Sequence, residues 1–168
     1  NDKENFWIID PIDGTTNFMH GIPHFAISID LRINDELKSG IIFDPIKNEM
    51  FYAEKDNGSF YNHPRVRVSK KTQLSEWLFA TSGIIDNELD IQFRKSGSAA
   101  LDMAYVACGR FDGYWQRELN YWDIAAGIII FKEAGGFVDF FEEDENFPLK
   151  KNVLATNSNI QEELRDLI

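Results

Sequence analysis

Two aspartates, Asp10 and Asp13, stand where an apolar run gives way to a turn near the start of the sequence. The apolar run at residues 7–9 predicts a buried strand. Pro11 disfavours helix at the residue before it, and Gly14 permits a tight turn beyond the second aspartate. The pattern therefore predicts a strand whose end carries two acidic side chains, followed by a turn into a helix.

The residues around these aspartates favour metal and phosphate chemistry. Ionised carboxylates and a loop carbonyl, such as that of Ile12, are hard oxygen ligands that suit Mg²⁺. Thr15 and Thr16 stand at the expected start of the helix, where their hydroxyls can act as caps. The backbone N–H groups of Gly14 and Thr15 can bind an anion there, together with the helix dipole.

Two other interpretations compete with a metal site. Asp-Gly is common in ordinary turns and Thr in ordinary helix caps, so the tetrapeptide alone has a purely structural explanation. A calcium loop of the EF-hand type needs oxygen ligands at alternate positions, followed by Gly and a distant Glu. Pro11 and Ile12 interrupt that spacing.

Composition and charge limit the kind of protein. The 168 residues, 43% of them hydrophobic, suffice for one substantial core, so we expect a single compact unit over residues 1–168. The formal net charge of −11 argues against direct binding of nucleic acid. The same charge would repel a phosphate substrate unless local cations neutralise the carboxylates, so an anion site built from aspartates implies a metal.

Two further features bear on location. The longest apolar run, at residues 124–131, is much too short to cross a bilayer, and no leader precedes Trp7, so we expect no membrane association. Cys108 is the single cysteine and cannot form an internal disulfide. A cytoplasmic protein fits both observations.

The hydrophobic pattern changes along the chain. Apolar residues alternate over residues 25–33, and short strand candidates follow at residues 37–43, 49–54, 59–61 and 66–68. Residues 1–70 are therefore expected to form mainly an antiparallel strand meander. Strands and helices alternate over residues 71–168, with strands expected at 77–80, 111–115, 137–141 and 152–155, and helices at 98–108, 122–134 and 160–168.

Two separated motifs closely resemble the signatures of the inositol monophosphatase family of Mg²⁺-dependent, lithium-sensitive phosphatases. They are DPIDGTTNF at residues 10–18 and NYWDIAAG at residues 120–127, in the family's order. The resemblance continues through HGIPHF at residues 20–25, SGSAA at 96–100 and EAGG at 133–136. It covers most of the chain and is greatest to the bacterial branch.

This resemblance implies an α/β fold, a layered α-β-α-β-α sandwich whose N-terminal part is absent from this chain. It also implies hydrolysis of a small-molecule phosphomonoester, inositol monophosphate or a similar polyol or sugar phosphate. The implied Mg²⁺ ligands are Asp10, the carbonyl of Ile12, Asp13 and Asp123. The implied catalytic residues are Asp13 and Thr15, and the implied contacts to phosphate and substrate are Gly14, Thr15, Gly97, Ser98, Ala99, Gln116 and Asp123.

Two departures from the family pattern bear on activity. The family places a further glutamate ligand upstream of the first signature, and only six residues precede Trp7 here. The metal site is incomplete as written, and an inactive fragment is one expected outcome. The position seven before Asp123 is commonly a glutamate that binds substrate hydroxyls, and here it is Gln116, whose amide still forms hydrogen bonds but carries no charge.

The resemblance also has implications for partners. Members of the family suggest a homodimer. The alternative to an enzyme is a regulatory, protein-binding role in a transcription complex, as bacterial relatives can have, with weak or no phosphatase activity.

Overall fold

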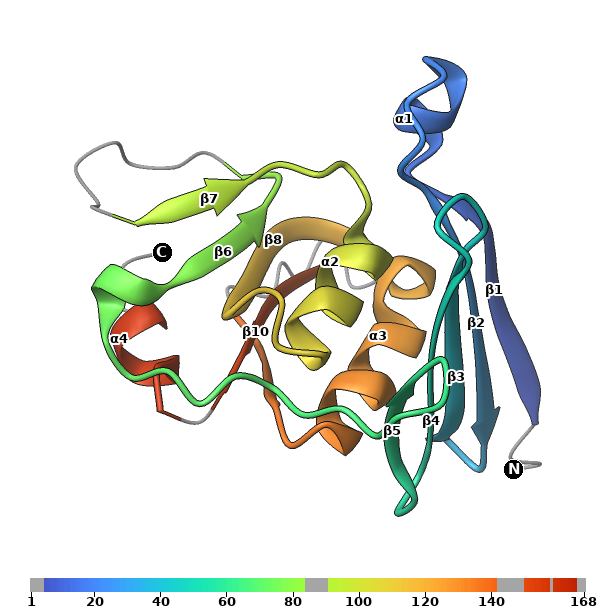
Figure 1. Ribbon diagram of the computed structural model, residues 1–168. Helices are drawn as coiled ribbons and strands as arrows, with labels where there is room; N and C mark the ends of the chain where they lie inside the picture. Colours follow the sequence, from blue (N-terminus) through green and yellow to red (C-terminus); the bar gives the residue numbers. More distant parts are fainter. Residues whose placement is uncertain (1–4, 84–90, 142–149, 158, 166–168) are drawn as a thin grey trace.

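The computed structural model describes residues 5–83, 91–141, 150–157 and 159–165, and two β-sheets dominate it (Figure 1). The first sheet is an antiparallel meander in which each strand pairs with the next along the chain. Its strands are β1 (Phe6–Asp13), β2 (Ala26–Ile33), β3 (Glu36–Asp44), β4 (Glu49–Glu54) and β5 (Gly58–Tyr61), and the short helix α1 (Thr15–Met19) joins β1 to β2.

The second sheet is mixed and has the strand order β7-β6-β8-β10-β9. Strand β6 runs parallel to both of its neighbours, and β10 runs antiparallel to both of its own. The strands are β6 (Leu78–Thr81), β7 (Gln92–Arg94), β8 (Gly113–Asn120), β9 (Phe137–Phe140) and β10 (Lys150–Thr156), and the 3₁₀ helix η1 (Leu74–Glu76) precedes β6.

Helices α2 (Ala99–Ala107) and α3 (Tyr121–Glu133) lie between the two sheets (Figure 1). Alternation along β10 separates its two faces, because Val153 and Ala155 join the core with these helices, whereas Leu154 packs with Ile160 and Leu164. Helix α4 (Gln161–Arg165) therefore covers the opposite face of the second sheet. The described residues form a sheet, helix, sheet, helix sequence of layers, and the predicted α/β sandwich is confirmed.

Two glycines let α3 approach its neighbours closely. A Cβ atom on Gly40 of β3 would lie 2.6 Å from Ile129 Cγ2 and 2.9 Å from the carbonyl oxygen of Ala126. A Cβ atom on Gly127 of α3 would lie 2.7 Å from Met103 Sδ of α2. Helix α3 is thus fixed against both the first sheet and α2, and its first turn is placed with it.

Most of the expected elements are found. The strands predicted at residues 25–33, 37–43, 49–54 and 59–61 are confirmed as β2 to β5, and the two long helices as α2 and α3. The strand predicted at residues 66–68 is wrong, since only Arg65 forms an isolated bridge, to Phe60. Strand β7 was not predicted, and β8 begins two residues later and ends five residues later than the strand expected at residues 111–115.

The prediction that residues 7–9 are buried is also wrong. Ile8 pairs with Asp30, which is buried on the face that meets α3, so Trp7 and Ile9 point to the opposite face of the sheet. Their exposed fractions are 60% and 55%. Strand β1 is present as predicted, but its run of consecutive apolar residues does not indicate which side chains face the core.

Candidate functional site

A β-bulge brings Asp10 and Asp13 to the same side of β1. Asp10 pairs with Ser28 and Asp13 with Ala26, so three steps along β1 match two steps along β2. Without the extra residue, positions 10 and 13 would face opposite sides of the sheet. The carboxylate Oδ1 of Asp10 accepts a hydrogen bond of 3.0 Å from the backbone N–H of Ile12, within the bulge.

Asp123 is contributed by the first turn of α3, as the sequence predicts. It forms a capping box with Asn120, whose backbone N–H donates a hydrogen bond of 2.8 Å to Asp123 Oδ2. Such a reciprocal cap fixes the beginning of the helix and the orientation of the acidic side chain. Strand β1 and helix α3 therefore contribute the acidic residues of one site, Asp10 and Asp13 from the strand and Asp123 from the helix.

Asp10, Asp13 and Asp123 form a cluster in which one oxygen from each lies within 4.8 Å of the others. Burial raises the pKa of Asp13 to about 7, and the charges of the other two carboxylates add to that rise. Burial also raises the pKa of Asp10, with a further contribution from Asp123. A divalent cation would relieve this repulsion, and three carboxylates are the hard oxygen donors that Mg²⁺ prefers.

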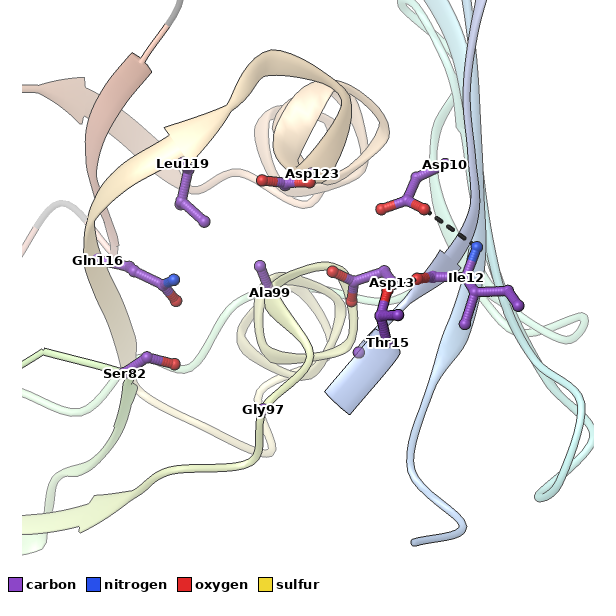
Figure 2. Close-up of a pocket in the computed structure, with 11 residues that line it drawn as sticks. Asp10, Ile12, Asp13, Thr15, Ser82, Gly97, Ala99, Gln116, Leu119 and Asp123 are labelled. Carbon is purple, nitrogen blue, oxygen red and sulfur yellow. Dashed lines mark hydrogen bonds between the residues drawn. The ribbon is translucent and has the colours of Figure 1, made fainter. Parts of the chain in front are cut away.

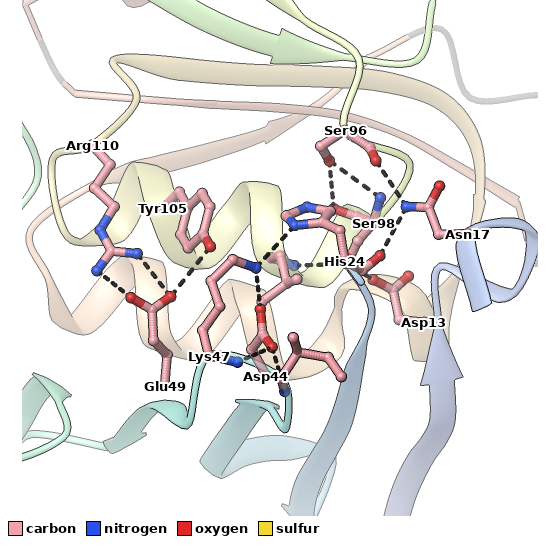
Figure 3. A network of polar contacts seen from close by, with 12 residues as sticks. Asp13, Asn17, His24, Asp44, Lys47, Glu49, Ser96, Ser98, Tyr105 and Arg110 are labelled. Atoms are coloured by element: carbon pink, nitrogen blue, oxygen red, sulfur yellow. Dashed lines mark hydrogen bonds and ion pairs between the residues drawn. The ribbon is translucent and has the colours of Figure 1, made fainter. Parts of the chain in front are cut away.

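The side chain of Asp13 is fixed by hydrogen bonds from residues at the start of α2 (Figure 3). Its Oδ2 accepts hydrogen bonds from the hydroxyl of Ser98 and, at 3.0 Å, from the backbone N–H of Ala100. Ser98 is 1% exposed and is also the N-cap of α2. The two donors occupy one oxygen of the carboxylate and leave Oδ1 for a ligand.

The turn after Asp13 differs in detail from the sequence expectation. Gly14 is the N-cap of α1, in the left-handed conformation with φ of 87°, and no side chain caps this helix. The expected caps at Thr15 and Thr16 are therefore absent, and with five residues α1 has little dipole to offer. The hydroxyl of Thr15 instead donates a hydrogen bond of 2.9 Å to the carbonyl oxygen of Ile12.

Asn17 joins this turn to the loop before α2. Its Nδ2 donates hydrogen bonds to the carbonyl oxygens of His24, at 2.8 Å, and Ser96, at 2.9 Å. A Cβ atom on Gly97 would lie 2.9 Å from that same nitrogen, so the close contact requires glycine. No sequence pattern indicated this role of Asn17, because its partners are backbone carbonyls and Ser96 is 79 residues away along the chain.

A second polar group lies further along α2 in Figure 3. Arg110 forms two hydrogen bonds with Glu49, of 2.9 and 2.7 Å, and Glu49 also accepts one of 3.0 Å from the hydroxyl of Tyr61. The Arg110 guanidinium holds the pKa of Glu49 below its usual range. These groups satisfy one another and fasten β4 to the end of α2.

The acidic cluster opens into a small pocket of about 170 Å³ (Figure 2). It is smaller than the ~300–1,000 Å³ typical of sites for drug-sized ligands, which favours a small substrate. The pocket is lined by eleven residues: Asp10, Ile12, Asp13, Gly14, Thr15, Ser82, Gly97, Ala99, Gln116, Leu119 and Asp123. They include nine of the ten residues predicted for the site, all except Ser98, and two that were not predicted, Ser82 and Leu119. Ser98, expected in the pocket lining, supports Asp13 instead.

A second bulge, in β8, explains why Gln116 and Leu119 both reach the pocket. Gln116 pairs with Val153 and Leu119 with Lys151, so Arg117 and Glu118 together oppose the one residue Asn152 of β10. Glu118 takes up the left-handed conformation with φ of 59° and is exposed. Such bulges are frequent beside active sites, and nothing in the sequence of β8 marks this one.

The geometry defines an α/β sandwich with an acidic, metal-binding type of site between its first sheet and its central helices. The whole sequence, residues 1–168, matches the inositol monophosphatase family. The chain belongs to this family of metal-dependent phosphatases.

Individual relatives agree with this assignment. An inositol-1-monophosphatase of Rhizobium meliloti is 40% identical over 183 residues, covering 99% of this chain and 68% of the relative. The Nus factor SuhB of Haemophilus influenzae is 38% identical over 184 residues, covering 99% of this chain and 68% of the relative. The crystal structure of the extragenic suppressor protein suhB from Bartonella henselae superposes with a TM-score of 0.89 at 42% identity, covering 99% of this chain and 73% of that one.

The described residues include no helix of the length and hydrophobicity needed to span a membrane.

Proposed function

We propose that this phosphatase hydrolyses inositol monophosphate, or a similar small polyol or sugar phosphate, with Mg²⁺ as its metal. The observation that carries the proposal is the cluster of Asp10, Asp13 and Asp123, which lines a pocket of about 170 Å³. An acidic site repels phosphate unless cations are bound, and the family match supplies the reaction class.

The three carboxylates and the carbonyl of Ile12 would hold the metal. Bound Mg²⁺ supplies charge neutralisation and activation of water in reactions of this class. Asp10 and Asp123 come from separate elements, so the ligand set depends on the packing of α3 against the first sheet. The fixed Oδ2 of Asp13 leaves its other oxygen for the metal.

The remaining roles fall to the turn at residues 14–15 and to the loop before α2. The backbone N–H groups of Gly14 and Thr15 are proposed to contact the phosphate, and the Thr15 hydroxyl to orient the attacking water. Gly97 and Ala99 line the pocket next to them and are proposed to contact the polyol. Gln116 lies across the pocket, where its amide would contact the same part of the substrate (Figure 2).

The test is phosphate release from inositol 1-phosphate by this polypeptide, measured with and without Mg²⁺ and then with added lithium. We expect release that requires Mg²⁺ and is inhibited by lithium. Release that proceeds equally in a chelator would contradict the metal assignment. Mg²⁺-dependent release from phosphomonoesters of another kind, such as phosphotyrosine, but not from inositol, glycerol or sugar monophosphates, would contradict the substrate class.

A regulatory binding role is the second candidate, favoured by the 38% identity to the Haemophilus influenzae protein named Nus factor SuhB. The two functions separate in a strain that depends on this protein. If an Asp13→Asn variant that lacks phosphatase activity still complements the strain, the binding role is the essential one. If complementation fails while the variant protein accumulates normally, catalysis is essential.

A homodimer and a cytoplasmic location are further parts of this proposal. Size-exclusion chromatography with light scattering tests the first, and cell fractionation tests the second.

A further inference from the structure

The end of the pocket that lies away from the acidic cluster is neutral. Among the eleven residues that line the pocket, the acidic ones are the three members of the cluster itself. Figure 2 shows Gln116 and Ser82 on the opposite side from Asp10. Both are uncharged side chains that can donate hydrogen bonds.

Gln116 is held by a neighbour on the same face of β8. Tyr114 is completely buried, and its hydroxyl donates a hydrogen bond of 2.8 Å to Gln116 Oε1. Burial and the nearby carboxylates raise the pKa of Tyr114 well above its ordinary value, so the hydroxyl keeps its proton and remains a donor. The Oε1 atom of the Gln116 amide is therefore already hydrogen-bonded to a neighbouring side chain of the protein.

This hydrogen bond determines what the amide offers to a ligand. With Oε1 engaged, the group left for the pocket is the Nε2 amino group, which only donates. If the amide were rotated, its amino group would face the Tyr114 hydroxyl, which would lose the acceptor that it has in the described residues. A carboxylate at position 116 could only accept hydrogen bonds and would add a fourth negative charge to the pocket.

We propose that Gln116, oriented by Tyr114, makes this end of the pocket a subsite for a hydrogen-bond-accepting or anionic group, so that the protein takes phosphomonoesters carrying a carboxylate close to the ester. This inference rests on the proposed phosphatase function and names a substrate class for it. A neutral donor accommodates a carboxylate, whereas a carboxylate side chain at the same place would repel it. Tyr114 is the positioning residue, since it acts through Gln116.

Two compounds that differ in one group provide the test. Glycerol 2-phosphate carries a hydroxymethyl group where 2-phosphoglycerate carries a carboxylate. The quantity measured is the ratio of kcat/KM for 2-phosphoglycerate to kcat/KM for glycerol 2-phosphate. For the unaltered protein we expect both compounds to be hydrolysed, with values within about tenfold of each other.

Three variants relate that ratio to the subsite. Gln116→Glu is expected to lower the ratio at least about tenfold through charge repulsion. Tyr114→Phe frees the amide to rotate and is expected to lower the ratio roughly threefold, through KM rather than kcat. Gln92→Glu makes the same chemical change at an exposed position on β7 that does not line the pocket, and it should leave the ratio within about twofold.

The outcomes separate this inference from the proposed function. Hydrolysis of glycerol 2-phosphate but not of 2-phosphoglycerate by the unaltered protein would overturn the subsite, as would an equal effect of Gln116→Glu on both compounds. If neither compound is hydrolysed, calorimetric binding of the two compounds with Ca²⁺ in place of Mg²⁺ decides the subsite, and phosphate release from inositol 1-phosphate decides the proposed function. Weaker binding of 2-phosphoglycerate to the Gln116→Glu variant, with Gln92→Glu unaffected, would support the subsite, and equal binding would reject it.

Discussion

The hydroxyl of Ser98 donates a hydrogen bond to Oδ2 of Asp13 and accepts one of 3.3 Å from the backbone N–H of Leu101. One side chain thus caps α2 and fixes a carboxylate of the acidic cluster. The stability of the helix and the geometry of the metal site are therefore coupled at a single residue.

Replacing Ser98 should weaken metal binding more than it weakens the fold. Ser98→Ala removes a donor that orients a proposed metal ligand, and such changes typically cost about 10- to 100-fold in affinity. The lost cap should lower the free energy of unfolding by about 1 kcal/mol. Ser98→Thr keeps the hydroxyl and should restore both properties, as measured by Mg²⁺ calorimetry and thermal unfolding.

A matched control separates the two effects. Ala107→Gly, at the other end of α2, should cost about 1 kcal/mol of stability or somewhat more without touching the site. Its Mg²⁺ affinity should equal that of the unaltered protein. Equal Mg²⁺ affinity in Ser98→Ala and Ala107→Gly would show that Ser98 is only a helix cap.

Thr15→Ala should lower kcat with little change in KM. The hydroxyl donates to the carbonyl of Ile12 and lines the pocket, so it is placed to orient a reacting group. Loss of one positioned group of this kind commonly costs roughly 10- to 1,000-fold in turnover. Steady-state kinetics on inositol 1-phosphate checks this, and Thr15→Ser should retain most of the activity. A rise in KM alone would place Thr15 in uniform substrate binding instead.

Gly40→Ala should destabilise the protein by about 1–3 kcal/mol, because the added methyl group meets Ile129 and the backbone of Ala126. The displaced α3 carries Asp123, so Mg²⁺ affinity should fall as well. Gly21→Ala introduces a methyl group where no atom lies within 4 Å, at φ of 69°, and should show only a backbone penalty of about 1–2 kcal/mol. Denaturant unfolding and Mg²⁺ titration of both variants test this difference.

Asp30 should make the protein less stable as the pH rises. It is 1% exposed, neither carboxylate oxygen has a hydrogen-bond partner among the described residues, and burial raises its pKa to about 7. The folded protein therefore holds a proton that the unfolded chain releases near pH 3.8, and stability declines between these two values.

Asp30→Asn should remove this decline. The amide resembles the protonated acid, so the variant should exceed the unaltered protein by at least about 1 kcal/mol at pH 8 and show little advantage at pH 4. Denaturant unfolding across this pH range provides the measurement. A variant that is less stable by the same amount at both values would show that the charge of Asp30 has no part in the effect.

The sequence predicted the elements more completely than their orientation. Hydrophobic periodicity and turn residues are local properties, and they located β2 to β5 and the two central helices correctly. Burial at Trp7 and Ile9 depends instead on which face of the first sheet meets α3, which no local pattern records. The strand predicted at residues 66–68 had the right composition but no partner strand in the described structure.

For the site, too, local sequence predicted some features and not others. Acidic residues next to turns, together with the family resemblance, indicated Asp10, Asp13 and Asp123. The two bulges were not predictable, because an extra residue in a strand leaves no mark in the hydrophobic pattern. Leu119 was therefore missed. Ser82, directly after β6, was also not predicted, and Ser98 was given a place in the pocket although its hydroxyl points to Asp13.

The catalytic role of the carboxylate cluster is tested by comparing Mg²⁺-dependent phosphate release from inositol 1-phosphate by the unaltered polypeptide and by its Asp13→Asn variant. We expect release by the unaltered polypeptide and at least about a thousandfold loss in the Asp13→Asn variant, whose thermal unfolding should remain cooperative. Equal release by the two proteins would contradict the claim that the carboxylate cluster is the catalytic centre.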